Sequence, residues 1–416
     1  MTKNDKRVKY ACYVTNVSMA VVANVPPLLF LTFREAYDIS YSLLGLLVLV
    51  NFCTQLLVDL FFSFFSYKIN VRTVVKLIPV FTAVGFALFA AAPLIFPNAV
   101  YFGLLLGTVI FAASGGFAEV LISPVVAALP SENSEREMSA LHSVYAWGTV
   151  GIIIVSALYF LFVGAENWQY LILGFIAVPA IAAILFSTST LPAHETPERA
   201  DGVSALLRNP ALWLCFVAIF LGGASESVMA QWSSSYLEHA LSIPKVWGDV
   251  CGVATFSLTL GVGRTLYSKY GKNIESVLLL GAIGAVICYL VAALVSVPVV
   301  GLIACALTGF CVSMLWPGSL IVAADRVVPG GVVMYAMMAA GGDLGASVGN
   351  QLVGVVVDAV AVNPWAIELA DKMGFGAEQL ALKVGMLLAA LFPIAAIFVY
   401  TYLVKTNKTR PNPDIM

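Results

Sequence analysis

The sequence predicts an all-α membrane protein with twelve transmembrane helices in two parallel-repeat six-helix bundles. Three observations lead to this fold class. The 416 residues are 61% hydrophobic and only 11% charged, with a mean hydropathy of +0.95, whereas soluble globular chains carry about 25% charged residues. The apolar residues fall into runs of about 20, the length that crosses a bilayer as a helix. A residue pattern of the first half recurs in the second half. Only helices or closed barrels satisfy the backbone in lipid, and these runs suit helices.

Twelve apolar runs qualify as spans. In chain order they are residues 10–33, 41–65, 73–95, 99–128, 139–163, 167–188, 210–237, 247–267, 274–297, 299–322, 332–360 and 381–404. The basic start of the chain precedes an apolar run without a small-residue cleavage site, and we interpret this run as an uncleaved first span.

Basic residues set the expected orientation, because cytoplasmic loops are enriched in Lys and Arg. With a cytoplasmic N-terminus, 17 of the 21 basic residues fall inside, and both termini are cytoplasmic. The four basic residues expected on the outer side of the membrane are Arg34, Lys245, Lys372 and Lys383.

The longest polar segment between spans is 189–209, and it divides the chain into equal sets of six spans. We therefore predict an N-terminal six-helix bundle at 1–188, a cytoplasmic linker at 189–209 and a C-terminal six-helix bundle at 210–416. Because six is even, both bundles enter the membrane from the same side, which makes the repeat parallel. The segment 362–380 is the one sizeable external loop that we expect.

The recurring pattern, here called the Gly-Phe-Pro frame, lies in spans four and ten. It consists of Gly116, Phe117 and Pro124 and, at the same spacing, Gly309, Phe310 and Pro317. Prolines within spans, including Pro26 and Pro27, bend helices and free carbonyl groups.

Three carboxylates lie well inside expected spans: Glu119, Glu226 and Asp343. An ionised side chain at this depth costs a few kcal/mol, so each is a functional candidate. We expect them to lack a basic partner and to be neutralised by a proton or a cation, which suits protons, Na⁺, cations or neutral polyols better than anions. The alternative is a permanently protonated acid that bonds a neighbouring helix.

Other polar and aromatic side chains share helix faces with these acids. In span eleven Asp343, Ser347 and Asn350 recur at helical spacing among glycines, where they either line a cavity or join two helices. In span two Asn51 and Gln55 offer amides suited to hydroxyl groups or to interhelical bonds.

The remaining candidates come from spans two, five, seven, eight and ten. They are Asp59 and Arg264 as gating residues and Gln231, Trp232, Trp316 and Tyr145 as substrate contacts, with Met229 on the same stripe as Trp232. His142, which shares a face with Tyr145 and Thr149, is either a partner for proton exchange with a carboxylate or a solvated histidine. Trp147 and Trp316 either line the cavity or pack between helices. Tyr236 is expected to be an interfacial anchor.

The layout resembles the major facilitator superfamily. The segment Gly263-Arg264-Thr265-Leu266-Tyr267-Ser268-Lys269-Tyr270-Gly271-Lys272 is similar to the glycine-and-basic loop of that superfamily. Gly222-Gly223-Ala224-Ser225-Glu226, followed by Gln231-Trp232 and Tyr236-Leu237, resembles the fucose-permease-like branch of sugar–cation symporters. The resemblance implies proton coupling through a glutamate of span four, which is Glu119 here. That branch also has an acid in span one, where this chain offers Asn16 and Asn24.

We expect a secondary transporter of the inner membrane that moves a small sugar or polyol with H⁺ or Na⁺ by alternating access. It would work as a monomer in the bilayer, without a cofactor, metal or nucleic acid. An exporter of lipophilic cations is the main alternative. A channel, or a receptor that has kept the fold without transport, is a further alternative.

A membrane enzyme is disfavoured, because the only GxSxG string, Gly345–Gly349, lies within an expected helix and not at a strand-to-helix turn. The seven cysteines lack CxxC spacing and indicate neither a disulfide framework nor a metal site.

Overall fold

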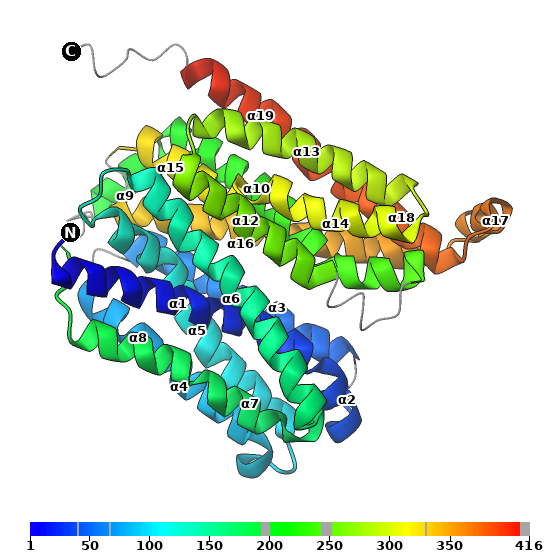
Figure 1. Ribbon diagram of the computed structural model, residues 1–416, viewed down its shortest axis with the longest axis horizontal. Coiled ribbons are helices and arrows are strands. Elements are labelled where there is room, and N and C mark those ends of the chain that lie inside the picture. Colours follow the sequence, from blue (N-terminus) through cyan, green and yellow to red (C-terminus); the bar gives the residue numbers. More distant parts are fainter. Residues whose placement is uncertain (40, 66–67, 193–199, 243–251, 329–330, 408–416) are drawn as a thin grey trace. The chain divides into compact units, whose positions relative to one another are not determined.

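A computed structural model describes residues 1–39, 41–65, 68–192, 200–242, 252–328 and 331–407, and every regular element in these ranges is a helix (Figure 1). Within them, nine helical segments are long and apolar enough to cross a membrane. The other three expected spans coincide with α1 (Lys3–Leu28), α3 (Tyr41–Phe65) and α12 (Thr255–Tyr270). The described part of the chain is therefore all-helical and has the long apolar helices of a multi-pass membrane protein, and the number of twelve crossings stays a prediction. Part of the expected linker, 193–199, and the start of the eighth span, 247–251, lie outside the described residues.

The chain divides into two compact units. Unit 1 comprises Met1–Arg208 and Val328–Ala340, and unit 2 comprises Asn209–Val327 and Gly341–Met416. Besides α1 and α3, the helices of unit 1 are α2 (Phe30–Tyr37), α4 (Val71–Ile95), α5 (Val100–Ala127), α6 (Ser134–Phe162), η2 (Ala165–Asn167), α7 (Trp168–Phe175), α8 (Ala177–Ser187) and α9 (Ala200–Leu207).

Asparagine side chains cap the starts of two helices of unit 1. Asn70 accepts a hydrogen bond from the Thr73 amide at the start of α4, and Asn133 accepts one from the Arg136 amide at the start of α6. Such caps satisfy amide groups that have no partner within the helix. The charged residues after Asn133, including Glu135 and Glu137, thus form the first turn of α6.

The core of unit 1 is aromatic at one end. The ring of Phe33 packs edge-on against those of Phe89 and Trp168, with centroids 5.8 and 5.0 Å apart. The α4–α5 hairpin closes against this cluster, since a Cβ at Gly107 would lie 2.8 Å from the backbone nitrogen of Phe89. Only a residue without a side chain permits this approach of two helices.

Unit 2 contains the remaining helices. They are α10 (Pro210–Ser235), the π-helical turn η3 (Tyr236–Ala240), α12, α13 (Ile274–Leu294), α14 (Pro298–Val312), α15 (Leu315–Arg326), α16 (Gly331–Ala361, in unit 2 from Gly341), α17 (Pro364–Met373), α18 (Ala377–Ala389) and α19 (Leu391–Asn407). Within this unit α13 packs against α14, α18 and α19. The expected tenth span is interrupted between α14 and α15, and the twelfth between α18 and α19.

A stripe of glycines joins α16 to α10. Phe216 and Ile219 lie against Gly341, the backbone of Phe220 against Gly345, and Ala224 and Val228 against Gly349. The contacts advance in the same direction along both helices, so α10 and α16 run parallel. Glycines repeated every fourth residue let the two backbones meet.

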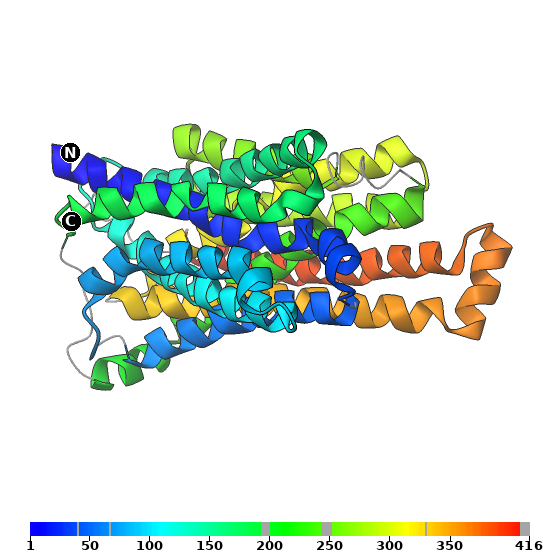
Figure 2. The same cartoon turned by 90° about the horizontal axis from the view of Figure 1, so that it is seen from below.

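The expected external segment forms a short helix, α17, which lies across the ends of α16 and α18 (Figure 2). Asn363 caps its start by accepting hydrogen bonds from the amides of Trp365 and Ala366. Its end is Gly374, whose φ of 72° lies in the left-handed region that glycine adopts without strain. Next to it, Lys383 of α18 is buried and donates to the Val295 carbonyl at 2.7 Å. This cation therefore satisfies the C-terminal end of α13.

Candidate functional site

In unit 1 two predicted amide residues lie next to the helix that carries Glu119. Asn51 and Gln55 are buried on α3, and Gln55 Nε2 donates to Asn51 Oδ1 at 3.3 Å. A Cβ at Gly115 of α5 would lie 3.3 Å from Gln55 Oε1. Glu119, which is half-buried, follows one turn later on α5. The structure thus places Gln55 against the turn of α5 that precedes Glu119, with Asn51 bonded to Gln55 on α3. Asp59, two turns from Asn51, is fully buried.

The polar residues of the first and fifth expected spans bond to one another. Asn16 Nδ2 donates to the Leu141 carbonyl at 2.8 Å. Asn24 Nδ2 donates to the Ala20 carbonyl at 2.8 Å and to Thr149 Oγ1 at 3.4 Å. These bonds hold α1 to α6. His142 and Tyr145 are half-buried, and Trp147 is 41% exposed.

A buried ion pair lies within unit 2. Arg264 on α12 is 2% exposed, and its Nη2 lies 2.9 Å from both carboxylate oxygens of Glu226 on α10. Arg264 Nε also donates to the Ser313 carbonyl at 2.8 Å. We expected Glu226 to lack a basic partner, and this expectation is wrong. It failed because the partner is on another helix, 38 residues away.

Asp343 on α16 differs from Glu226. It is 5% exposed, and its Oδ2 has no hydrogen-bond partner in the described part of the chain. Two turns later Asn350 Nδ2 donates to Ser227 Oγ on α10 at 2.7 Å and to the Ala346 carbonyl at 2.9 Å. Its Oδ1 likewise has no partner among the described residues. The face predicted from helical spacing therefore presents two buried oxygens that can accept a proton, a cation or a hydroxyl donor.

Trp316 packs beside this face. A Cβ at Gly342 would overlap its ring, and a Cβ at Gly223 would lie 3.1 Å from ring atom Cζ3. The indole therefore occupies the space left by two glycines, one of which directly precedes Asp343.

Span seven departs from expectation at one residue, Tyr236, while Gln231 and Trp232 stay predicted substrate contacts. Gln231 is exposed, and Trp232 packs against Gly354 of α16. Tyr236 was expected at the membrane interface, but it is fully buried and its hydroxyl donates to the Ala292 carbonyl. Sequence reasoning also missed Ser227 and the Arg264 bond to Ser313. A serine next to Glu226 and a proline four residues after Ser313 are the signals that point to them.

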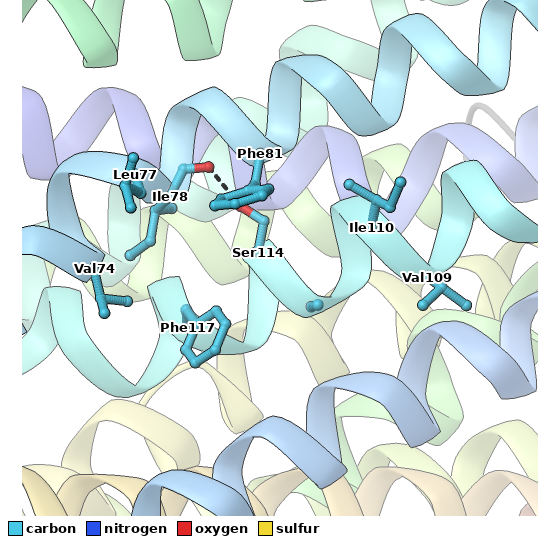
Figure 3. Close-up of a pocket in the computed structure, with 9 residues that line it drawn as sticks. Val74, Leu77, Ile78, Phe81, Val109, Ile110, Ser114 and Phe117 are labelled. Carbon is cyan, nitrogen blue, oxygen red and sulfur yellow. Dashed lines mark hydrogen bonds between the residues drawn. The ribbon is translucent and has the colours of Figure 1, made fainter. Parts of the chain in front are cut away.

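A groove between α4 and α5 of unit 1 lies apart from these polar groups (Figure 3). It encloses about 340 Å³. Its lining is Val74, Leu77, Ile78, Phe81, Val109, Ile110, Ala113, Ser114 and Phe117. The Ser114 hydroxyl already donates to the Ile78 carbonyl at 2.7 Å, and it lies 2.6 Å from the Thr82 hydroxyl. A polar solute would find no unused polar group here, so we do not place the site in this groove.

The described residues contain no group of three or more His, Cys, Asp or Glu side chains that could hold a metal ion.

Sequence comparison assigns the family. A profile of the Major Facilitator Superfamily matches residues 11–350. The chain belongs to this superfamily. Its members are transporters, so the protein is a transporter and not an enzyme, as the sequence indicated. No curated protein sequence matches the chain.

Solved structures of the superfamily share the fold. FucP in an outward conformation superposes with a TM-score of 0.72 at 16% identity, covering 95% of this chain and 98% of that chain. The proton:xylose symporter XylE gives 0.73 at 13% identity, covering 95% and 96%. The human organic anion transporter MFSD10 gives 0.71 at 14% identity, covering 96% and 100%. At these identities the likeness shows the fold alone.

Proposed function

We propose that the protein is a secondary active transporter that moves a small polar solute, a sugar or polyol, together with H⁺ or Na⁺ by alternating access. The observation that carries the proposal is the pair of unused acceptor oxygens on α16, Asp343 Oδ2 and Asn350 Oδ1. A buried acceptor without a donor costs about 1–3 kcal/mol. Such groups are expected where a substrate hydroxyl or a coupling ion completes the site.

Unit 1 supports the same chemistry. The amides of Asn51 and Gln55 can bond hydroxyl groups, and the Glu119 carboxylate on the adjacent helix supplies an ionisable group. We assign ion coupling to Glu119 and Asp343, and solute contacts to Asn51, Gln55 and Asn350, with Trp316 offering an aromatic face to the solute. The Gly-Phe-Pro frame supports a parallel two-fold repeat of six helices each.

Two of the structural relatives are described as a fucose:proton symporter and a proton:xylose symporter, which favours a sugar as the solute. The distribution of basic residues favours the inner membrane with cytoplasmic termini. No observation favours the export of lipophilic cations over this function.

The test is uptake into proteoliposomes. Purified protein would be reconstituted and offered labelled neutral sugars, polyols and lipophilic cations, with the pH gradient and the Na⁺ gradient imposed separately. We expect gradient-dependent accumulation of at least one polyhydroxyl solute and loss of this accumulation in Asp343→Asn. Asp358→Asn, the same change at an exposed carboxylate of α16, is the matched control and should keep accumulation. Accumulation of lipophilic cations without any polyol would overturn the proposal.

A further inference from the structure

The interruption between α14 and α15 leaves a carbonyl group that the helix itself cannot satisfy. Proline has no backbone N–H, so Pro317 cannot donate to the carbonyl four residues earlier, which belongs to Ser313. The next amide along, that of Gly318, donates to the Met314 carbonyl at 2.7 Å. Ser313 is 4% exposed, so its carbonyl needs a donor from elsewhere in the protein.

Arg264 supplies that donor. Its Nε lies 2.8 Å from the Ser313 oxygen, while its Nη2 bonds both oxygens of Glu226. The planar guanidinium carries donors in fixed directions, so one side chain serves two acceptors at once. Glu226 neutralises the arginine, which would otherwise be a buried unpaired charge. Three elements are thus joined at one point: α10, α12 and the interruption after α14.

The interruption determines where Trp316 lies. This residue directly precedes Pro317 in the first turn of α15, and its ring fills the space beside Gly223 and Gly342. Gly342 is the neighbour of Asp343, whose Oδ2 is one of the unused acceptors. A shift of the Ser313–Pro317 segment would therefore move the indole that packs beside Asp343.

We propose that Arg264 is a positioning residue for solute binding: by bonding the Ser313 carbonyl and Glu226 together, it sets the interruption of the tenth span and holds Trp316 beside Asp343. Glu226 is accordingly a fixed counter-charge of Arg264 and not a coupling acid. This inference rests on the proposed function, because it gives Trp316 and Asp343 their roles in solute binding.

The first experiment is Arg264→Lys. A lysine keeps the positive charge but lacks the planar fork, so it cannot hold Glu226 and the Ser313 carbonyl in the same way. We expect the KM for the transported polyol to rise about tenfold or more, because one charge-assisted hydrogen bond is lost. The maximal rate should change less than the KM. Arg208→Lys, at an exposed arginine that ends the first segment of unit 1, is the matched control and should leave the KM unchanged. An unchanged KM in Arg264→Lys would overturn the proposal.

The second experiment is a rescue. Pro317→Ala restores an amide that can donate to the Ser313 carbonyl within the helix. Combined with Arg264→Lys, it should bring the KM back to within about threefold of its value in Pro317→Ala alone, since that amide replaces the lost bond. Pro124→Ala, at the equivalent frame position in unit 1, should not rescue Arg264→Lys. If Pro317→Ala and Pro124→Ala behave alike, Arg264 does not act through the interruption.

A third measurement does not depend on transport. Hydrogen–deuterium exchange of the detergent-solubilised protein, followed by mass spectrometry, should show faster exchange of the Arg264→Lys variant in peptides covering 313–320. Peptides covering 118–127 of α5 should be unchanged. If the wild-type protein accumulates no polyol but this exchange pattern holds, the proposed function fails while the link from Arg264 to the interruption stands. If the exchange at 313–320 does not change, the inference itself fails.

Discussion

The two copies of the Gly-Phe-Pro frame pack alike but differ in their charges. In unit 1 Gly116 of α5 lies against Gln55 and Val58 of α3, and in unit 2 Gly309 of α14 lies against Phe256 and Thr259 of α12. Each frame thus joins the fourth expected span of its half to the second. However, α5 continues through Pro124, whereas α14 ends at Val312 and α15 begins at Leu315.

The ionisable groups follow the same division. Two residues after the frame phenylalanine, unit 1 has Glu119 and unit 2 has the buried apolar residue Val312. Unit 2 instead has a carboxylate on α10, tied to an arginine on α12. The helix packing can therefore be the same in both units while the charged residues around it differ. The packing requires only that the frame glycine has no side chain, whereas a charge is gained or lost by changing one residue. We expect Glu119 to change its protonation during transport and Glu226 to keep its charge.

The largest expected effect is on transport. Glu119→Gln removes the ionisable group of the first frame while keeping its size, so gradient-driven accumulation should be lost while solute exchange at equal concentrations continues. Counterflow and accumulation assays in the same proteoliposomes separate the two. Accumulation that survives in Glu119→Gln would show that coupling lies elsewhere.

Glu226→Gln should act on stability instead. It leaves the buried Arg264 without its counter-charge, and breaking a buried pair from one side costs about 3–5 kcal/mol. The apparent melting temperature in detergent should fall markedly, and the double variant Glu226→Gln with Arg264→Met should recover part of the loss. A stable Glu226→Gln protein with altered pH dependence of uptake would contradict the role of counter-charge.

The frame glycines offer a smaller and directly matched comparison. A Cβ at Gly309 would overlap the Phe256 carbonyl oxygen, whereas a Cβ at Gly116 would lie 3.0 Å from Val58 Cβ and 3.1 Å from Gln55 Cα. Overpacking costs about 1–3 kcal/mol, and we expect Gly309→Ala near the upper end and Gly116→Ala near the lower end. Thermal unfolding of both variants measures the difference. Equal losses would mean that the two helix contacts are equally tolerant.

The smallest effects concern two arginines at helix ends. Arg7 donates to the Thr188 carbonyl after α8 at 2.8 Å from an exposed position. Arg326 is better enclosed, donates to the Leu403 carbonyl and to Thr406 Oγ1 at 2.8 Å, and lies 3.6 Å from Glu275. Arg326→Ala should therefore cost about 1.5 kcal/mol and Arg7→Ala less than about 1 kcal/mol. Melting curves of both variants at two salt concentrations would measure the two losses of stability. A larger loss of stability for Arg7→Ala than for Arg326→Ala would contradict this prediction.

The pattern of apolar runs predicted most helices to within a few residues. Span four was expected at 99–128 and is Val100–Ala127, and span eleven was expected at 332–360 and is Gly331–Ala361. This success reflects the bilayer, which requires long apolar helices whatever their neighbours are. Helical spacing also predicted the shared face of Asp343 and Asn350, since that face is a local property of one helix.

Contacts between helices could not be predicted in the same way. Tyr236 is a residue type typical of an interfacial anchor, yet packing of η3 against α14 and α18 buries it, and its hydroxyl bonds to Ala292 of α13. The pairing of Glu226 with Arg264 depends on which turns of α10 and α12 face each other.

The sequence by itself determined the membrane class, the helices and which faces carry polar groups, because these follow from hydropathy and helical period. Only the tertiary structure decided which carboxylate is paired and which keeps an unused oxygen, because a buried charge is stabilised by groups that are near in space and distant in the chain.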